Sequence, residues 1–381
     1  MEFMRFLHLS DLHLGRRLGE LSLIEDQRFI LAQIIRLVRE EHPDAILIAG
    51  DVYDKSIPST EAVIMFDGFL NELSELGVPT LIISGNHDSA ERLSFASKLI
   101  AKSGVHIASV YDGTLFPITL SDGETDVNFY LLPFIKPSNV KRFYPDADIT
   151  SYTDALRCAI QNADIDCSAL NVLVTHQFVT GAQRSESEEI SVGGADNCDA
   201  SVFDGFDYVA LGHIHRAQIA GAPHVRYCGT PLKYSFSEAS HNKTFTMVEL
   251  TGKGELHIKE YPIKSLREIR EIRGTYDEIA ARSYYADTGL RDELLHITLT
   301  DEDDVPDAIG RLRTIYRYLL KLDYDNARTR SEAEITPMQD LEEKSPLELV
   351  CDLFRLQNDR EMTAEQKRYC AELFDRMKEE A

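Results

Sequence analysis

Five groups of metal-binding residue types recur in order between residues 11 and 215 of the chain. They are Asp11 with His13, then Asp51, then Asn86 with His87 and Asp88, then His176, and finally His213 with His215. Carboxylate, imidazole and amide ligands together suit divalent Mn, Fe or Zn better than the all-oxygen sites of Mg or Ca. Seven of these residues, all except His87 and Asp88, are candidate ligands. Seven ligands are more than one ion needs and are enough for two ions that share a bridging carboxylate. This set predicts a two-metal phosphoesterase, in which ions about 3.5 to 4 Å apart hold the phosphate and generate a hydroxide nucleophile.

Each of these groups follows an apolar run that is typical of a β-strand. The runs are FLHLS, AILIAG, TLIISG, NVLVT and DYVALG, and helix-like stretches at 26–40 and 61–76 separate the first three. Strands that alternate with helices predict a parallel sheet, whose active site lies beyond the carboxyl ends of its strands. Because residues two apart in a strand point the same way, the Asp-x-His and His-x-His pairs are each expected to present both side chains to one point.

The order of the elements predicts an α/β fold with a second, smaller domain. Residues 1–265 are expected to form a sandwich of two sheets flanked by helices, including a hairpin at 114–135. Residues 266–331 read as strand, helix, strand, helix, strand, with the second helix at 305–320, which indicates a small α+β capping domain. Residues 332–344 are polar and are expected to form a linker.

Residues 345–381 carry the clearest local signals in the chain. Capping boxes, SPLE from Ser345 and TAEQ from Thr363, predict the starts of two helices, the first with proline at its first position. Apolar residues at i, i+3, i+4 and i+7 give each helix one apolar face. Because the pair follows a polar linker, we expect it to dock on the helices of a partner protein rather than on its own chain.

The ordered groups D-x-H, G-D, G-N-H-D, H and G-H-x-H resemble the calcineurin-like metallophosphoesterase superfamily. The surrounding segments narrow the resemblance to the SbcD family, the nuclease subunits of bacterial SbcCD complexes; they include LHLSDLHLGRRL, LIAGDVYDKSIPS, ISGNHDSAERL and YCGTPLKYSFSE. This resemblance implies an ATP-dependent double-strand 3′–5′ exonuclease that is also a single-strand and hairpin endonuclease, acting in DNA end processing, replication and recombination. It also implies an SbcC-like SMC-type ATPase as partner and a homodimer within a heterotetramer, through helices near the nuclease core.

The resemblance also implies a role for each residue of the five groups. One ion takes Asp11, His13, Asp51 and His215, and the other takes Asp51, Asn86, His176 and His213, with Mn²⁺ as the expected metal. His87 matches the family's catalytic histidine, which is suited to protonate the departing 3′ oxygen. Asp88 is expected to orient His87 or to brace its loop. Asp54 stands where eukaryotic and archaeal relatives carry a histidine, which favours the bacterial branch.

Two other functions share parts of this pattern. A small-molecule phosphodiesterase or phosphatase of the same superfamily would use every ligand, and the extra domain and the terminal helices disfavour it. A non-catalytic DNA-end scaffold would need no intact ligand set. The segment GTPLKYSF lacks the G-x-x-x-x-G-K-[ST] spacing of a phosphate loop, so ATP dependence must come from the partner. We expect this segment to form a substrate-facing loop near the metals, and His8 to pack in the core.

The charge of the chain bears on DNA binding. The 381 residues carry a formal net charge of −24 at pH 7, which argues against a nucleic-acid partner. Residues 311–330, however, hold six basic and two acidic residues, and two divalent ions would compensate part of the acidity. We therefore expect weak, salt-sensitive DNA binding by this chain alone. With no run of about 18 apolar residues and no signal-peptide pattern, a cytoplasmic protein is expected, associated with the nucleoid when bound to DNA.

Overall fold

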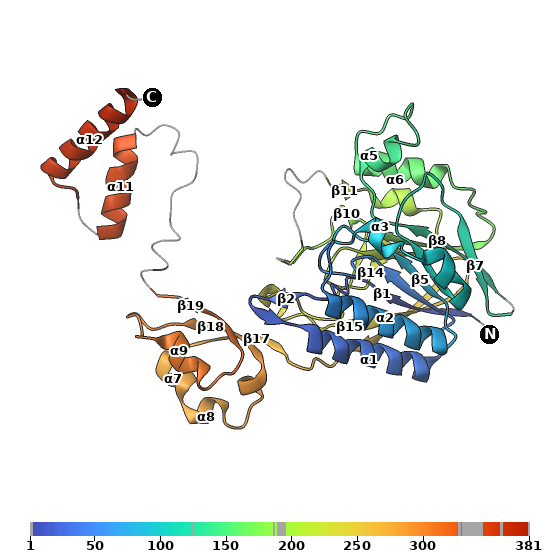
Figure 1. Ribbon diagram of the computed structural model, residues 1–381, viewed down its shortest axis with the longest axis horizontal. Coiled ribbons are helices and arrows are strands. Elements are labelled where there is room, and N and C mark those ends of the chain that lie inside the picture. The colour runs from blue at the N-terminus through green and yellow to red at the C-terminus, as the bar shows by residue number, and fades with distance from the viewer. Residues whose placement is uncertain are drawn as a thin grey trace. The chain divides into compact units, whose positions relative to one another are not determined.

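The computed structural model describes residues 3–123, 125–185, 187–188, 196–326, 329, 346–358 and 361–379 (Figure 1). It contains two compact units. The first comprises Met1–Glu271 with Asp292–Leu295, and the second comprises Ile272–Arg291 with His296–Ala381. The predicted linker at 332–344 and the capping residue Ser345 lie outside the described residues.

The first unit contains a six-stranded sheet in the order β16-β15-β1-β4-β5-β6. Its strands are β1 (Met4–Leu9), β4 (Ala45–Ala49), β5 (Thr80–Ile83), β6 (Val105–Ala108), β15 (Thr244–Gly252) and β16 (Glu255–Pro262). The strands β1, β4, β5 and β6 run parallel, and β15 lies antiparallel to β1. The predicted parallel arrangement is therefore confirmed, and the carboxyl ends of β1, β4 and β5 meet at one edge.

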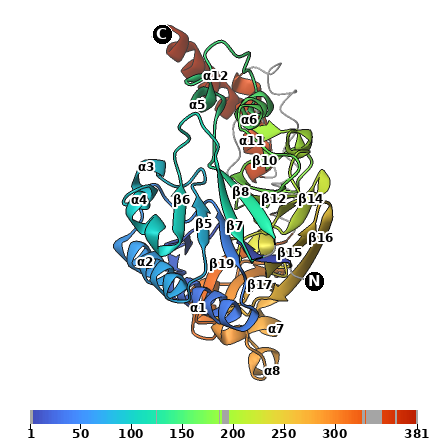
Figure 2. The same ribbon diagram turned by 90° about the vertical axis from the view of Figure 1, so that its right-hand side faces the viewer.

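Two long helices, α1 (Ile24–Glu41) and α2 (Thr60–Glu75), cover the outer face of this sheet (Figure 1). Helix α1 buries Ile30, Ile34 and Val38, which recur at helical spacing. Helix α2 begins at Ser59, whose hydroxyl accepts a hydrogen bond from the backbone N–H of Ala62. Both helices occur where the sequence predicts them. Two short helices, α3 (Ala90–Leu93) and α4 (Ser97–Ile100), precede β6 and lie beside it at the edge of the sheet (Figure 2).

The second sheet also has six strands, in the order β13-β14-β12-β9-β8-β7. Its strands are β7 (Pro117–Ser121), β8 (Asp126–Leu132), β9 (Leu170–His176), β12 (Tyr208–Gly212), β13 (Gln218–Ala220) and β14 (Ala222–Tyr227). The antiparallel pair of β7 and β8 is the predicted hairpin. Helices α5 (Pro137–Lys141) and α6 (Tyr152–Gln161) pack on this sheet. Two small strand pairs complete the unit, β2 (Arg17–Leu18) with β3 (Leu21–Ser22) and β10 (Phe178–Val179) with β11 (Asn197–Cys198).

The core between the two sheets is made from inward-facing residues of both. The ring of Phe6 in β1 lies 5.5 Å from that of Phe129 in β8 and 5.6 Å from that of Tyr208 in β12. Leu47 and Ala49 of β4 belong to this same core. The structure is thus the α/β sandwich of two sheets flanked by helices that the sequence predicts.

A small sheet in the order β17-β18-β19 belongs mostly to the second unit, although the first residues of β17 and of β18 are assigned to the first unit. The strands of this sheet and the helices between them are β17 (Ile269–Gly274), α7 (Tyr276–Ala280), α8 (Arg282–Tyr285), β18 (Leu294–Leu299), α9 (Ala308–Arg313) and β19 (Leu319–Tyr324). The predicted order of strands and helices is confirmed, but the second helix is much shorter than 305–320. The buried Tyr316 explains the difference, because its hydroxyl donates to the carbonyl of Ile279 at 2.7 Å and anchors a turn before β19.

Two helices, α11 (Pro346–Asn358) and α12 (Ala364–Glu379), form the C-terminal part of the described chain. The capping box at the start of α12 is present, since Thr363 N–H donates to Gln366 Oε1 at 2.9 Å and Gln366 N–H donates to Thr363 Oγ1 at 3.3 Å. In the described residues, no helix combines the length and the apolar character needed to cross a membrane.

Candidate metal centre

The predicted ligands come together at the carboxyl ends of strands from both sheets. Asp11 and His13 follow β1, Asp51 follows β4, Asn86 follows β5, His176 ends β9, and His213 and His215 follow β12. All of these side chains except Asn86 are buried, with exposed fractions from 0% to 8%. The sandwich therefore brings residues that are up to 204 positions apart into one enclosed site.

The paired ligands do not lie within strands, so alternation along a strand is not what aims them. Strand β1 ends at Leu9 and β12 ends at Gly212, and the ligands sit in the loops that follow. The backbone is left-handed at Asp11 (φ 52°), His13 (φ 43°), Asp51 (φ 49°) and His213 (φ 101°). Such strain costs roughly 1–3 kcal/mol at each residue and persists only where the surroundings enforce it. The loops after β1 and β4 enforce this backbone on each other at Asp11, His13 and Asp51. Asp11 N–H donates to the Gly50 carbonyl, and His13 N–H donates to the Asp51 carbonyl.

Two glycines of the sequence motifs allow these loops to approach closely. A Cβ atom at Gly212 would lie 1.9 Å from the carbonyl oxygen of Ala49, and one at Gly85 would lie 2.1 Å from Oδ1 of Asp51. Any other residue at either position would push the two sheets or the Asp51 loop apart. The glycines of G-N-H-D and G-H-x-H are therefore packing requirements of the site.

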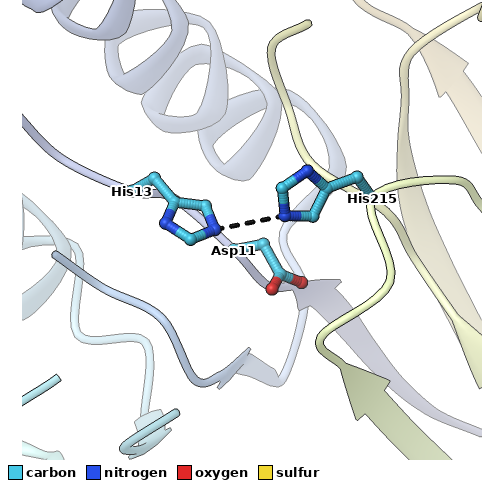
Figure 3. A group of neighbouring side chains, drawn as sticks. All are labelled: Asp11, His13 and His215. Atoms are coloured by element: carbon cyan, nitrogen blue, oxygen red, sulfur yellow. Dashed lines mark hydrogen bonds between the residues drawn. The ribbon is translucent and has the colours of Figure 1, made fainter. Parts of the chain in front are cut away.

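The first group of ligands contains Asp11, His13 and His215 (Figure 3), whose ligand atoms all lie within 4.8 Å of one another. The Nε2 atoms of His13 and His215 lie 3.2 Å apart. Nε2 of His13 also lies 3.7 Å from Oδ2 of Asp51. Asp11 additionally accepts the backbone N–H of His213 at 3.0 Å, which ties the β1 loop to the β12 loop.

The second group surrounds the amide of Asn86. Oδ1 of Asn86 lies 3.1 Å from Nε2 of His176 and 2.9 Å from Nδ1 of His213. Nε2 of His176 lies 3.3 Å from Oδ2 of Asp51. The same carboxylate oxygen of Asp51 thus faces a histidine of each group. The structure brings together each of the two ligand sets that the family resemblance implies, with Asp51 between them.

The charges in the site favour a divalent cation. Burial would raise the pKa of Asp51, but the neighbouring His176, His13 and His87 lower it well below its usual range, so Asp51 is ionised. Burial lowers the pKa of His13, and it lowers that of His213 to about 3, so both rings are neutral. Burial also opposes the charged form of His176, yet the Asp51 carboxylate raises its pKa to about 9. Beside Asp51, His176 therefore holds a proton, which a divalent cation bound to the same carboxylate would displace, because histidine binds a metal only as the neutral imidazole.

His87 lies at the edge of the two groups and, like Asn86, is only partly buried. Its backbone N–H donates to Oδ1 of Asp51 at 2.9 Å, its Nδ1 lies 3.0 Å from the Asp54 carbonyl, and its ring packs edge-on against His13. The Asp54 side chain accepts a hydrogen bond from Arg16 at 2.8 Å. A carboxylate oxygen of Asp54 also belongs to a third group of close ligand atoms, with His13 and His87.

Asp88 braces the loops around His87. Its carboxylate accepts the backbone N–H groups of Val52 at 3.1 Å, Tyr53 at 2.9 Å and Gly85 at 3.0 Å. Burial and the Asp51 charge raise the pKa of Asp88 to about 6. Of the two roles that the sequence left open for Asp88, this geometry favours the bracing one.

Sequence reasoning missed a layer of buried polar side chains beneath the ligands. Gln27 of α1 donates to the carbonyl of His13 at 2.7 Å and accepts the N–H of Gly15 at 2.9 Å. The GTPLKYSF segment belongs to this layer rather than to a substrate-facing surface, because Thr230, Leu232 and Tyr234 are buried. The Tyr234 ring packs 5.5 Å from His13, and its hydroxyl donates to the carbonyl of Leu12. The only sequence signal for this layer was the resemblance of the GTPLKYSF segment to the SbcD family.

A buried ion pair lies behind His215. Glu238 is fully buried, and its Oε2 lies 2.5 Å from Nζ of Lys243. Burial would raise the pKa of Glu238, but its contacts with His215 and Lys243 lower it well below the usual range. Lys243 also donates to the carbonyl of His215 at 2.8 Å. Glu238 ends the family-like segment YCGTPLKYSFSE, Lys243 lies outside every quoted motif, and both support a predicted ligand.

Comparison with known proteins agrees with this geometry. The family profile described as calcineurin-like phosphoesterase matches residues 4–217, and the profile described as type 5 capsule protein repressor C-terminal domain matches residues 265–358. SbcD of Staphylococcus epidermidis, a subunit of the nuclease SbcCD, is 33% identical over 344 residues, which cover 88% of this chain and 90% of that protein.

Solved structures were found at lower similarity. A dimetal phosphatase from Danio rerio is 14% identical with a TM-score of 0.39, and an archaeal phosphodiesterase is 13% identical with a TM-score of 0.30. Each match covers 68% of this chain and 99% of the other. The two family profiles, the Staphylococcus relative and the buried ligand groups together show a hydrolase with a divalent-metal site. The chain belongs to the SbcD family of calcineurin-like phosphoesterases.

Proposed function

We propose that this protein is the nuclease component of an SbcCD-type complex and hydrolyses DNA phosphodiesters with two divalent ions. The position of the Asp51 carboxylate supports this proposal most strongly, because Oδ2 lies 3.7 Å from a histidine of one ligand group and 3.3 Å from a histidine of the other. One ion is held by Asp11, His13, Asp51 and His215, and the other by Asp51, Asn86, His176 and His213. The mixture of imidazole, carboxylate and amide donors suits divalent Mn, Fe or Zn, and the family resemblance makes Mn²⁺ the expected ion.

His87 is the acid that protonates the leaving 3′ oxygen. Two bound divalent ions supply a clamp on the phosphate and a hydroxide at neutral pH. The backbone of His87 is held by Asp51 at 2.9 Å, so the ring stays beside the ligand groups without being needed as a ligand. Asp88 keeps the Gly85 turn and the loop after β4 at a fixed separation, which sets the distance between His87 and the reacting phosphate.

The second unit provides a surface for DNA. Arg311 and Arg313 on α9 and Arg317 in the turn after it are exposed and lie close together along the chain. Exposed arginines bind phosphates without regard to sequence, and their contribution weakens as salt rises. We assign residues 266–331 as the capping domain that contacts the duplex, next to a nuclease domain at 1–265.

The two terminal helices dock on the ATPase partner. Leu353 of α11 and Leu373 and Tyr369 of α12 are 54%, 39% and 60% exposed, so large apolar side chains are available for a partner. A pair of amphipathic helices fits the helices of a coiled coil, and the SMC-type ATPase of the complex carries one. Its ATP hydrolysis gives the complex its double-strand 3′–5′ exonuclease activity, while this chain alone cleaves single strands and hairpins.

A homodimer forms through the helices at the edge of the first sheet. Ile64 of α2, Phe95 after α3 and Leu99 of α4 are 66%, 84% and 71% exposed. Helices α2, α3 and α4 lie side by side near β6 (Figure 2), and a cavity of about 470 Å³ between them is lined largely by apolar residues. Two copies joined here, each with one ATPase, make a heterotetramer that acts on the DNA of the nucleoid.

A cleavage assay on a hairpin-ended duplex tests the proposal. We expect Mn²⁺-dependent opening of the hairpin by the chain alone, and exonuclease digestion only after the SbcC-type partner and ATP are added. Turnover of an aryl phosphodiester without any DNA cleavage would identify a small-molecule phosphodiesterase instead. Binding of DNA ends without metal and without cleavage would identify a scaffold.

A further inference from the structure

The two ring nitrogens of His215 have different surroundings. Nε2 points toward His13 and the ligand group, at 3.2 Å from Nε2 of His13 (Figure 3). Nδ1 points away from that group and lies 2.7 Å from Oγ of Ser187. A neutral imidazole carries one proton, and only the nitrogen without it can bind a metal. The partner of Nδ1 therefore decides whether Nε2 is available as a ligand.

The hydroxyl of Ser187 is already committed as a donor. It donates to Oε1 of Glu238 at 2.6 Å. Because a hydroxyl has a single proton, Oγ can only accept a hydrogen bond from Nδ1 of His215. Nδ1 must then carry the imidazole proton, which leaves the lone pair of Nε2 facing the ligand group. The direct separation of Nδ1 and Glu238 Oε1 is 3.6 Å, too long for a good hydrogen bond, so Ser187 carries the connection.

Glu238 can only accept, because it is a buried carboxylate paired with an ammonium. Its side chain is 0% exposed and that of Lys243 is 7% exposed, at 2.5 Å between Oε2 and Nζ. Lys243 also donates to Oγ1 of Thr230 at 2.6 Å, and Tyr234 N–H donates to Oε1 of Glu238 at 3.2 Å. These contacts fix the direction of each hydrogen bond in the series that links His215, Ser187, Glu238 and Lys243.

The loop that carries Ser187 is fastened to His215 at a second point. Oε1 of the adjacent Glu188 accepts the backbone N–H of His215 at 2.7 Å. The side chain and the backbone of one ligand are thus both held by consecutive residues of this loop.

We infer that Ser187 is a positioning residue that fixes the tautomer and the orientation of His215 for metal binding, with Glu238 and Lys243 as its buried anchor. The inference rests on the proposed role of His215 as a ligand of one ion. Outer partners of ligating histidines commonly account for about 10- to 100-fold in metal affinity. Without the Ser187 hydroxyl, His215 is free to place its proton on Nε2, where it blocks the metal.

Three variants of the full-length protein test this inference. Ser187→Ala removes the hydroxyl, Ser187→Thr keeps it, and Ser240→Ala removes an exposed hydroxyl from a neighbouring segment as a matched control. Mn²⁺ binding is measured by equilibrium dialysis, with free Mn²⁺ counted by electron paramagnetic resonance, and the melting temperature of each metal-free variant is recorded. We expect Ser187→Ala to bind one of two ions about 10- to 100-fold more weakly, with an unchanged melting temperature. Ser187→Thr and Ser240→Ala should bind both ions like the parent.

The outcomes separate this inference from the proposed function. If Ser187→Ala holds both ions with the affinity of the parent, the positioning role is wrong while the two-metal site stands. Equal weakening in Ser187→Thr and Ser187→Ala would also overturn it, since the hydroxyl would then not matter. If the parent protein itself binds no Mn²⁺, the two-metal proposal fails, and this inference fails with it. Glu238→Gln is a fourth variant: its amide can donate to Oγ, which turns the Ser187 proton toward Nδ1, so it should weaken the binding of the same ion.

Discussion

The Nε2 atoms of His13 and His215 lie 3.2 Å apart, although the two residues are 202 positions apart in the chain. Two imidazole lone pairs repel at this separation unless a proton or a cation lies between them. Nitrogen ligands about 2.1 Å from one ion, at roughly a right angle, would stand about 3 Å apart. The fold thus holds two nitrogen ligands at the spacing that one bound ion would require. The left-handed backbone at His13 contributes to the energetic cost of this arrangement.

Replacing the shared carboxylate should empty the site. We expect Asp51→Ala to lose both ions and DNA cleavage together, because its carboxylate faces a histidine of each ligand group. Metal content by inductively coupled plasma mass spectrometry, measured beside hairpin cleavage, checks this. Asp204→Ala, which changes an exposed aspartate, is the control and should keep both ions. An Asp51→Ala protein with two tightly bound ions would rule out the bridging role.

Removing the catalytic imidazole should separate metal binding from chemistry. His87→Ala should retain two ions and lose cleavage by about 10²- to 10⁴-fold, which is the usual contribution of a general acid. The same metal analysis and hairpin assay apply, with His106→Ala in the half-buried part of β6 as the control. A His87→Ala enzyme of normal activity is incompatible with the role assigned to this residue.

The core histidine His8 should make the fold sensitive to acid. His8 is 0% exposed, its Nδ1 lies 2.9 Å from the Tyr208 hydroxyl, and burial together with the charge of Arg226 lowers its pKa to about 3. In the unfolded chain the pKa is about 6.5, so the unfolded state binds the extra proton and stability falls as pH drops from 6.5 toward 3. Between pH 7.5 and pH 5.5 this one group should cost about 1.4 kcal/mol.

Urea unfolding of metal-free protein at these two pH values measures the effect. His8→Gln should lose about 1.4 kcal/mol less than the parent over the interval, whatever its stability at pH 7.5. His257→Gln, at an exposed position of β16, controls for removing a histidine from the same sheet. Equal pH dependence in the parent and in His8→Gln would mean that His8 is not held neutral.

Truncation before Ser345 should remove the partner without harming the nuclease site. The deleted helices belong to the second unit, whereas every proposed ligand belongs to the first. Co-purification with the SbcC-type ATPase should be lost, and Mn²⁺-dependent cleavage of single strands should remain. Retained association after truncation would place the docking surface elsewhere on the chain.

Much of the site could be predicted because each motif directly follows an apolar run. Strands β4 and β5 are continuous apolar segments, and a sheet that is parallel must bring their carboxyl ends, and so Asp51 and Asn86, to one edge. What aims the ligands could not be predicted in the same way. The left-handed backbone of Asp11 and of Asp51 depends on hydrogen bonds between two loops, which no local pattern encodes.

The supporting residues were harder still to predict. Ser187 and Glu238 are 51 positions apart; Ser187 lies in a polar segment, and Glu238 ends the family-like segment YCGTPLKYSFSE without any sign that it supports a ligand. Their importance follows only from the burial of Glu238 and from its ion pair with Lys243, and both depend on the tertiary structure. The length of α9 was missed for a similar reason, because the turn at Tyr316 is set by a distant carbonyl.

The most direct test of the two-metal claim is an anomalous difference map of crystals soaked in MnCl₂. We expect two peaks about 3.5 to 4 Å apart, one beside His13 and His215, the other beside His176 and His213, with the Asp51 carboxylate between them. A single peak, or two peaks that do not share Asp51, would contradict the account.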